Sequence, residues 1–138
     1  MTDDELIAQF ESGELPAGKF HHSDHVQLAF AYLTRFTPIE ALNHFVEGLK
    51  RFAGRLGKSG LYHETITYAY FFLIRERMAR MPRLDWEDFA RENADLLEWK
   101  PGILGRYYRN VTLKSDLARR VFVFPDQSVP WDSEHLSG

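Results

Sequence analysis

The chain contains no cysteine. Disulfides, thiolate metal sites and cysteine nucleophiles are therefore excluded. The chain also lacks an excess of positive charge, because 17 Lys and Arg stand against 20 Asp and Glu, for a net charge of -3. A general nucleic-acid binder needs a basic surface that neutralises phosphates, so we expect no nucleic-acid partner.

Long apolar segments are missing as well. The N-terminal stretch MTDDELIAQF is acidic where a signal peptide would be basic, and no run long enough to span a bilayer follows it. We therefore expect a cytoplasmic protein with no membrane partner. The G-x-S-x-G motif of serine hydrolases and the complete G-x-x-x-x-G-K-S/T motif of phosphate-binding loops are also absent from the sequence, which argues against both classes.

The sequence is rich in aromatic residues and in helical periodicity. Hydrophobic residues make up 44% of the 138 positions, and eleven Phe are among them, so the core is expected to be built largely from rings. Apolar positions recur at helical spacing in several segments, and no period-two run is long enough to build a sheet. We predict a single all-α domain over residues 1–138, a bundle of five to seven helices, with 126–138 as a polar tail.

The element predicted to organise this bundle is the stretch 62–81, YHETITYAYFFLIRERMARM. Its middle, 66–74, contains no charged residue, and Pro82 ends it. A helix that is apolar most of the way round is usually buried in its domain, and this one is too short to cross a bilayer. The sequence therefore predicts one buried central helix.

Start signals mark the other helices. Thr2 and Ser115 are suitable N-caps, Pro38 suits the first helical position, and a helix is expected to begin at His22 or Ser23. The remaining expectations are a helix over 3–11, a helix from 38 to about 56, a short helix over 86–97, one or two turns at 103–108, a short helix over 116–121, extended chain at 122–125, and a segment at 129–131 that folds back on the body.

Histidines gather near two of the predicted helix starts. His22 and His25 are three residues apart and share a helix face, and His63 begins the 62–81 stretch. Imidazoles with a carboxylate, from Asp24 or Glu64, form the ligand set expected for zinc, manganese, non-haem iron or nickel. We predict His22, His25 and His63 as the ligands of such a divalent metal. A metal-free acid–base pair and purely structural histidines are the two alternatives.

The start of the 62–81 stretch is also the predicted chemical centre. His63 and Glu64 are the candidate catalytic groups, and Thr67 and Tyr70 continue the polar line along the helix, where they can line a ligand pocket. In the alternative interpretation, Glu64 only complements the helix dipole and Thr67 bonds back to the carbonyl of His63.

A third group of residues lies near the C-terminal end. Tyr107 and Arg119 are candidate ligand-binding residues, because an inward-facing arginine beside tyrosines can hold a carboxylate or phosphate. The backbone N–H groups after Ser115 could contribute to such a site. The alternative is a solvated face with an Asp116–Arg120 ion pair.

Three segments carry a resemblance. FHHSDHV begins at Phe20, LYHETIT begins at Leu61, and LKSDLARRVFVFPD begins at Leu113. Together they resemble a family of small bacterial all-helical proteins with F-x-H-x-D-H-V and Y-H-E-T-I-T segments. The resemblance covers about 20–126 and implies no catalytic assignment.

Two functional hypotheses follow from these residues. The first is a small enzyme with a histidine-centred site, either metal-dependent or acid–base. Its substrate would be a small molecule, either anionic or neutral. The second is a non-catalytic helical module that binds a small apolar or aromatic ligand and has structural histidines. An interaction domain is a third class. Substrate and oligomeric state do not follow from the sequence.

Overall fold

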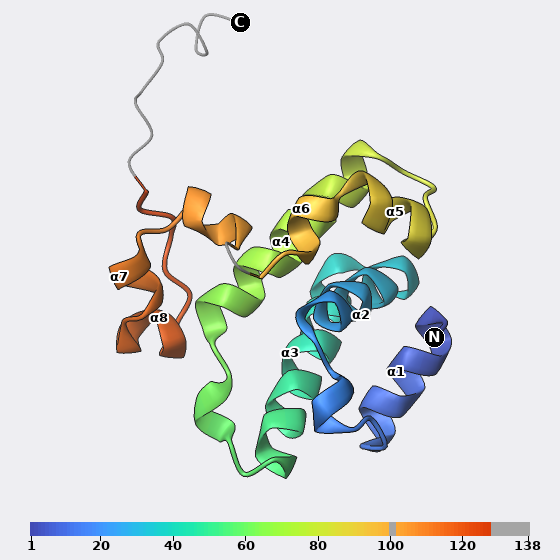
Figure 1. Cartoon of the computed structure of the whole chain (residues 1–138), viewed down its shortest axis with the longest axis horizontal. Helices are drawn as coiled ribbons and strands as arrows, with labels where there is room; N and C mark the ends of the chain where they lie inside the picture. The colour runs from blue at the N-terminus through green and yellow to red at the C-terminus, as the bar shows by residue number, and fades with distance from the viewer. Residues whose placement is uncertain (100–101, 128–138) are drawn as a thin grey trace, which may run out of the picture.

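The computed structural model describes residues 1–99 and 102–127, and within these ranges it contains helices and no strand (Figure 1). The all-α prediction is confirmed. Short 3-10 turns lie at Ala17–Lys19, Ser59–Leu61 and Ile103–Arg106. The α-helices of the described ranges are α1 (Asp3–Ser12), α2 (His22–Arg35), α3 (Pro38–Arg55), α4 (Glu64–Arg80), α5 (Trp86–Glu92), α6 (Ala94–Leu97), α7 (Asn110–Leu113) and α8 (Asp116–Arg120).

These eight helices exceed the predicted five to seven. The predicted 86–97 helix is broken at Asn93, which is buried and donates its side-chain amide to the carbonyl of Phe89. The short helix α7 was not predicted. Both differences concern helices of four residues, whose existence depends on tertiary contacts more than on sequence periodicity.

The predicted helix starts are confirmed. Thr2 Oγ1 accepts a hydrogen bond from the amide of Glu5 at 3.1 Å, and Ser115 Oγ accepts one from Ala118 at 3.1 Å. Helix α2 begins at His22, and the Asp24 carboxylate accepts a hydrogen bond from the backbone N–H of His21, the N-cap residue, at 2.9 Å. Each of these bonds satisfies an N–H group that the helix itself leaves free.

Helix α2, and not α4, is the buried centre of the fold. Seven consecutive residues of α2, 26–32, are buried, and the helix contacts α1, α3, α4, α5 and α6. Helix α4 buries only Thr65, Tyr70, Phe71 and Ile74, and 47% of Phe72 is exposed. The prediction of 62–81 as the buried central helix is therefore wrong, because an apolar sequence does not say how many sides of a helix find neighbours.

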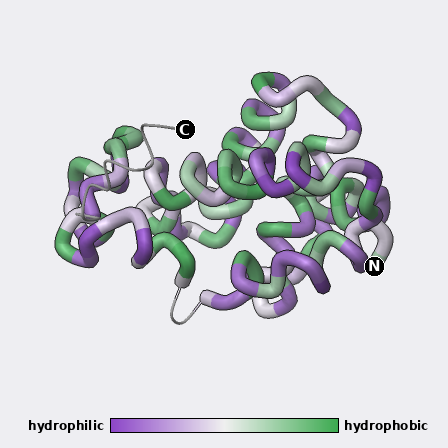
Figure 2. Tube along the Cα trace, turned by 90° about the horizontal axis from the view of Figure 1, so that it is seen from above, coloured by the Kyte–Doolittle hydropathy of each residue, from purple (hydrophilic) through white to green (hydrophobic). Residues whose placement is uncertain are grey.

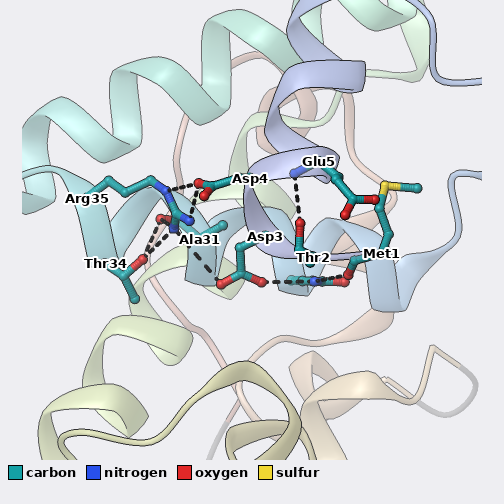
Figure 3. A network of polar contacts seen from close by, with 9 residues as sticks. Met1, Thr2, Asp3, Asp4, Glu5, Ala31, Thr34 and Arg35 are labelled. Atoms are coloured by element: carbon teal, nitrogen blue, oxygen red, sulfur yellow. Dashed lines mark hydrogen bonds and ion pairs between the residues drawn. The ribbon is translucent and has the colours of Figure 1, made fainter.

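Polar contacts attach the N-terminal helix to α2 (Figure 3). Arg35 donates to Asp4 Oδ1 from its Nε at 3.0 Å, and Gln27 donates to Asp3 Oδ1 at 2.9 Å. Further along the chain, Arg77 on α4 pairs with Asp95 on α6 at 2.9 Å. In Figure 2, hydrophilic and hydrophobic positions alternate along much of the helical tube, as expected for helices that keep one face in solvent.

The C-terminal helices α7 and α8 pack beside the first half of α4, on the side away from α1 (Figure 1). Thr65 donates from Oγ1 to the carbonyl of Val121 at 2.9 Å and accepts from the N–H of Val123 at 3.1 Å. Asp126 accepts from the N–H of Arg109, so the beginning of the predicted polar tail is anchored. The predicted fold-back at 129–131 lies outside the described residues.

No helix in 1–99 or 102–127 is both long enough and apolar enough to cross a membrane.

Candidate functional site

A cavity of about 590 Å³ lies where the beginnings of α2 and α4 meet the inner face of α3. Phe45, Leu49 and Phe52 of α3 form one wall, and Ile66 and Ile74 of α4 form another. Its volume falls within the range of pockets that bind small molecules. The described residues that line it include no Asp or Glu. The polar residues of the lining are His22, His25, Tyr62, His63, Thr67, Tyr70 and Arg119.

The structure thus gathers six of the eight predicted site residues around one cavity. Two of them lie elsewhere. Glu64 accepts a hydrogen bond from the Tyr62 hydroxyl at 2.6 Å and does not line the cavity. Tyr107 lies against a separate, shallower depression formed with Phe72 and Leu73. Neither residue is therefore placed to contact a ligand in the main cavity.

His63 is the N-cap of α4, and hydrogen bonds occupy both of its ring nitrogens. Nδ1 accepts from the N–H of Ile66 at 3.1 Å, and Nε2 lies 2.7 Å from the carbonyl oxygen of Leu113. Because a carbonyl can only accept, Nε2 carries the proton. His63 therefore fixes the start of α4 and holds α7 in place, and no ring nitrogen is left for a ligand in this arrangement.

One ring nitrogen of His22 has no hydrogen-bond partner in the described part of the chain. Its Nε2 donates to the carbonyl of Leu96 at 2.9 Å, so in the neutral ring Nδ1 carries a lone pair. Its ring lies edge-on to Tyr70, with centroids 4.7 Å apart, and 5.0 Å from the ring of Trp99. Burial lowers the pKa of His22, and the hydrogen bond to Leu96 opposes that effect in part.

His25 is held by packing and not by hydrogen bonds. Its ring stacks on Phe20 with centroids 4.1 Å apart. Burial, with a smaller contribution from the charge of His22, lowers the pKa of His25 to about 4, so the ring is neutral at pH 7. Neither ring nitrogen has a hydrogen-bond partner among the described residues, and neither is fully enclosed, so both are open to a ligand in the cavity.

Thr67 and Tyr70 complete the α4 side of the cavity. Thr67 donates to the carbonyl of His63 at 2.7 Å, which was the local alternative expected from the sequence, and it lines the cavity as well. The Tyr70 hydroxyl is buried and has no hydrogen-bond partner among the described residues. Burial raises the pKa of Tyr70 to about 12, and the nearby backbone of Ile103, which does not reach hydrogen-bond geometry with the hydroxyl, opposes this in part, so the hydroxyl stays protonated.

Arg119 is the charged residue of the described lining. It is exposed and donates to the carbonyl of Gly60, in the turn that precedes α4. Its guanidinium group has further N–H donors that this one bond does not use. The neighbouring Arg120 pairs with Asp116 at 2.7 Å, as the alternative interpretation expected, and does not line the cavity.

Sequence reasoning missed several aromatic residues of the lining. Phe20, Tyr62 and Trp99 come from loops or loop ends, and nothing in their spacing marks them as neighbours. Phe45, Leu49 and Phe52 were expected on one helix face, but the sequence does not reveal that part of this face borders a cavity.

The predicted three-histidine metal site stays a prediction. His22, His25 and His63 line the same cavity, but among the described residues no group of three His, Asp or Glu is arranged to hold one ion. Binding through His63 would require a ring nitrogen to leave Ile66 or Leu113. His135 lies outside the described residues, and the ring of His44 stacks on those of Tyr32 and Phe36.

Comparison with known proteins leaves the family open. The resemblance seen in the three sequence segments therefore stays an expectation. No family model, no curated protein and no solved structure matches this chain.

Proposed function

We propose that this protein binds a small, largely apolar molecule with an anionic group in the cavity between α2, α3 and α4. The observation that carries the proposal is the combination of a cavity of about 590 Å³ with a largely apolar, aromatic wall. Such a cavity gains binding free energy from apolar contact, and a few polar groups fix the orientation of the ligand.

The charge of the lining supports an anion. Arg119 is cationic, the half-buried His22 and His25 are expected to be neutral, and the described lining contains no acidic residue. A carboxylate or sulfonate at the exposed end can accept charge-assisted hydrogen bonds from Arg119 while the body of the ligand lies against the rings of α3. A cationic ligand would find no counter-charge there.

Two fluorescent probes test the proposal. The anionic probe is anilinonaphthalenesulfonate, and the neutral probe is N-phenylnaphthylamine. We expect both to bind, with saturable fluorescence enhancement. Arg119→Gln is expected to weaken the anionic probe about fivefold and to leave the neutral probe unchanged, since a charge-assisted hydrogen bond is worth roughly 1.5 kcal/mol or somewhat less at an exposed site. Arg120→Gln, one residue further on, is the matched control.

A second pair of variants tests the location. Ala53→Phe adds a ring to the cavity lining on α3, and Asn43→Phe adds the same ring to an exposed position of the same helix. We expect the first to weaken both probes at least tenfold and the second to weaken neither. Equal binding by both variants would place the probes elsewhere and contradict the proposal.

An acid–base enzyme is the second candidate, and the free nitrogens of His25 are the observation in its favour. A base with a pKa of about 4 is poorly matched to proton transfer near pH 7, which is why binding is the better supported function. Conversion of a bound ligand over time, followed by mass spectrometry and lost in His25→Phe, would favour the enzyme.

A further inference from the structure

His22 and His25 lie one turn apart at the start of α2, and both line the cavity. Residues three apart on a helix have their β-carbons roughly 5–6 Å apart, so one small group between the two rings can reach both.

The hydrogen-bonding capacity of the two rings is defined by their surroundings. The carbonyl of Leu96 occupies the N–H of His22, so its free Nδ1 can only accept. His25 has no partner among the described residues, so its neutral ring offers one N–H donor and one acceptor. The pair therefore presents at least one donor and one acceptor toward the same part of the cavity.

A carboxylate does not complement this pair. It cannot donate to His22 Nδ1, and the described lining places its one cation, Arg119, beside Gly60 at the start of α4. A carbonyl or ether also lacks the donor. A hydroxyl group both donates and accepts, and it satisfies the two rings together.

We propose that the cavity selects ligands that carry a hydroxyl group, which donates to His22 Nδ1 and accepts from the ring N–H of His25. This inference rests on the proposed function and specifies the ligand class, a hydroxylated aromatic or alicyclic acid. The anionic end lies toward Arg119 and the hydroxyl end toward His22 and its neighbour Tyr70. Tyr70 is seven residues beyond His63, or about 10 Å along the axis of α4. This distance sets the expected separation between the anionic group and the hydroxyl group of the ligand.

A matched pair of ligands tests the hydroxyl. The probes are 6-hydroxy-2-naphthoate and 6-methyl-2-naphthoate, which have similar shape and the same carboxylate. Calorimetric titration of the full chain is expected to show about tenfold tighter binding of the hydroxyl compound, because two hydrogen bonds of roughly 0.5–1.5 kcal/mol each separate the two ligands. Equal affinities would overturn the inference while leaving the proposed function intact.

Variants assign the selection to residues. His25→Phe keeps a ring against Phe20. It is expected to abolish the tenfold preference for the hydroxyl compound, with binding of the methyl compound retained. His25→Gln keeps a donor and an acceptor and is expected to restore part of the preference. His44→Phe, at a histidine that stacks on Tyr32 and Phe36 and does not line the cavity, is expected to leave the preference for the hydroxyl compound unchanged.

A preference that survives in His25→Phe would overturn the role of His25. Failure of both naphthoates to bind or to displace anilinonaphthalenesulfonate would overturn the inference. Loss of probe binding as well would remove the proposed function.

Discussion

The Nε2 atom of His63 lies 2.7 Å from the carbonyl oxygen of Leu113, so the N-cap of α4 also holds the C-terminal helices. The same ring accepts from the N–H of Ile66. One side chain therefore joins two segments that are 50 residues apart and keeps Arg119, on the neighbouring α8, beside the cavity.

His63→Ala is expected to lower the free energy of unfolding by about 2–3 kcal/mol, because it removes a helix cap worth roughly 1 kcal/mol and a partly buried hydrogen bond of similar value. His63→Asn can still cap α4 but is too short to reach Leu113, so it should lose only about half as much. Urea unfolding measures both. An alanine variant as stable as the parent protein would exclude this structural role.

Two of the buried tyrosines, Tyr70 and Tyr108, should respond differently to loss of the hydroxyl. Tyr108 donates to the carbonyl of Val123 at 2.8 Å, so Tyr108→Phe is expected to cost about 1 kcal/mol. The Tyr70 hydroxyl has no partner among the described residues, so Tyr70→Phe should leave stability unchanged or raise it by up to about 1 kcal/mol. Thermal unfolding of the two variants gives the comparison. A large loss in Tyr70→Phe would reveal a hydrogen bond at that hydroxyl.

Two adjacent phenylalanines on α4 test how much of that helix is buried. Phe71 is fully buried, and 47% of Phe72 is exposed. Phe71→Ala is expected to cost about 3–5 kcal/mol through lost burial and a new cavity, whereas Phe72→Ala should cost about 1 kcal/mol or less. Equal losses in urea unfolding would mean that α4 is enclosed on all sides, as the sequence suggested.

His25 should make stability depend on pH. Its pKa is about 4 in the folded chain and near the ordinary value of 6.5 when unfolded, so between these values the unfolded chain binds more protons. Stability is therefore expected to fall as pH decreases from 6.5 to 4, by roughly 1–3 kcal/mol, since one unit corresponds to about 1.4 kcal/mol. Burial lowers the pKa of His22 as well, which adds to the same trend.

The matched comparison for this trend is His25→Phe, which removes the contribution of His25 and leaves that of His22. Unfolding in urea at a series of pH values should show a smaller loss in this variant than in the parent protein. Identical pH profiles of the two proteins would mean that His25 titrates normally in the folded chain.

Local signals in the sequence predicted the helix starts well. Thr2, Pro38 and Ser115 each act within a few residues, through caps and fixed backbone angles, so their effect is readable without the fold. The two histidine-bearing segments that the sequence singled out both line one cavity, and a ligand-binding role for them stays a prediction.

The sequence by itself determined that the chain is helical and where most of its helices begin, because periodicity and caps are local properties. The tertiary structure alone decided that α2 is the buried helix, that the ring of His63 bonds to Leu113, and that the ring of His25 has no hydrogen-bond partner within 1–99 and 102–127. These outcomes depend on which distant groups come within hydrogen-bond or packing distance. Such contacts join residues as far apart as His22 and Leu96, whose separation in sequence carries no information about their proximity.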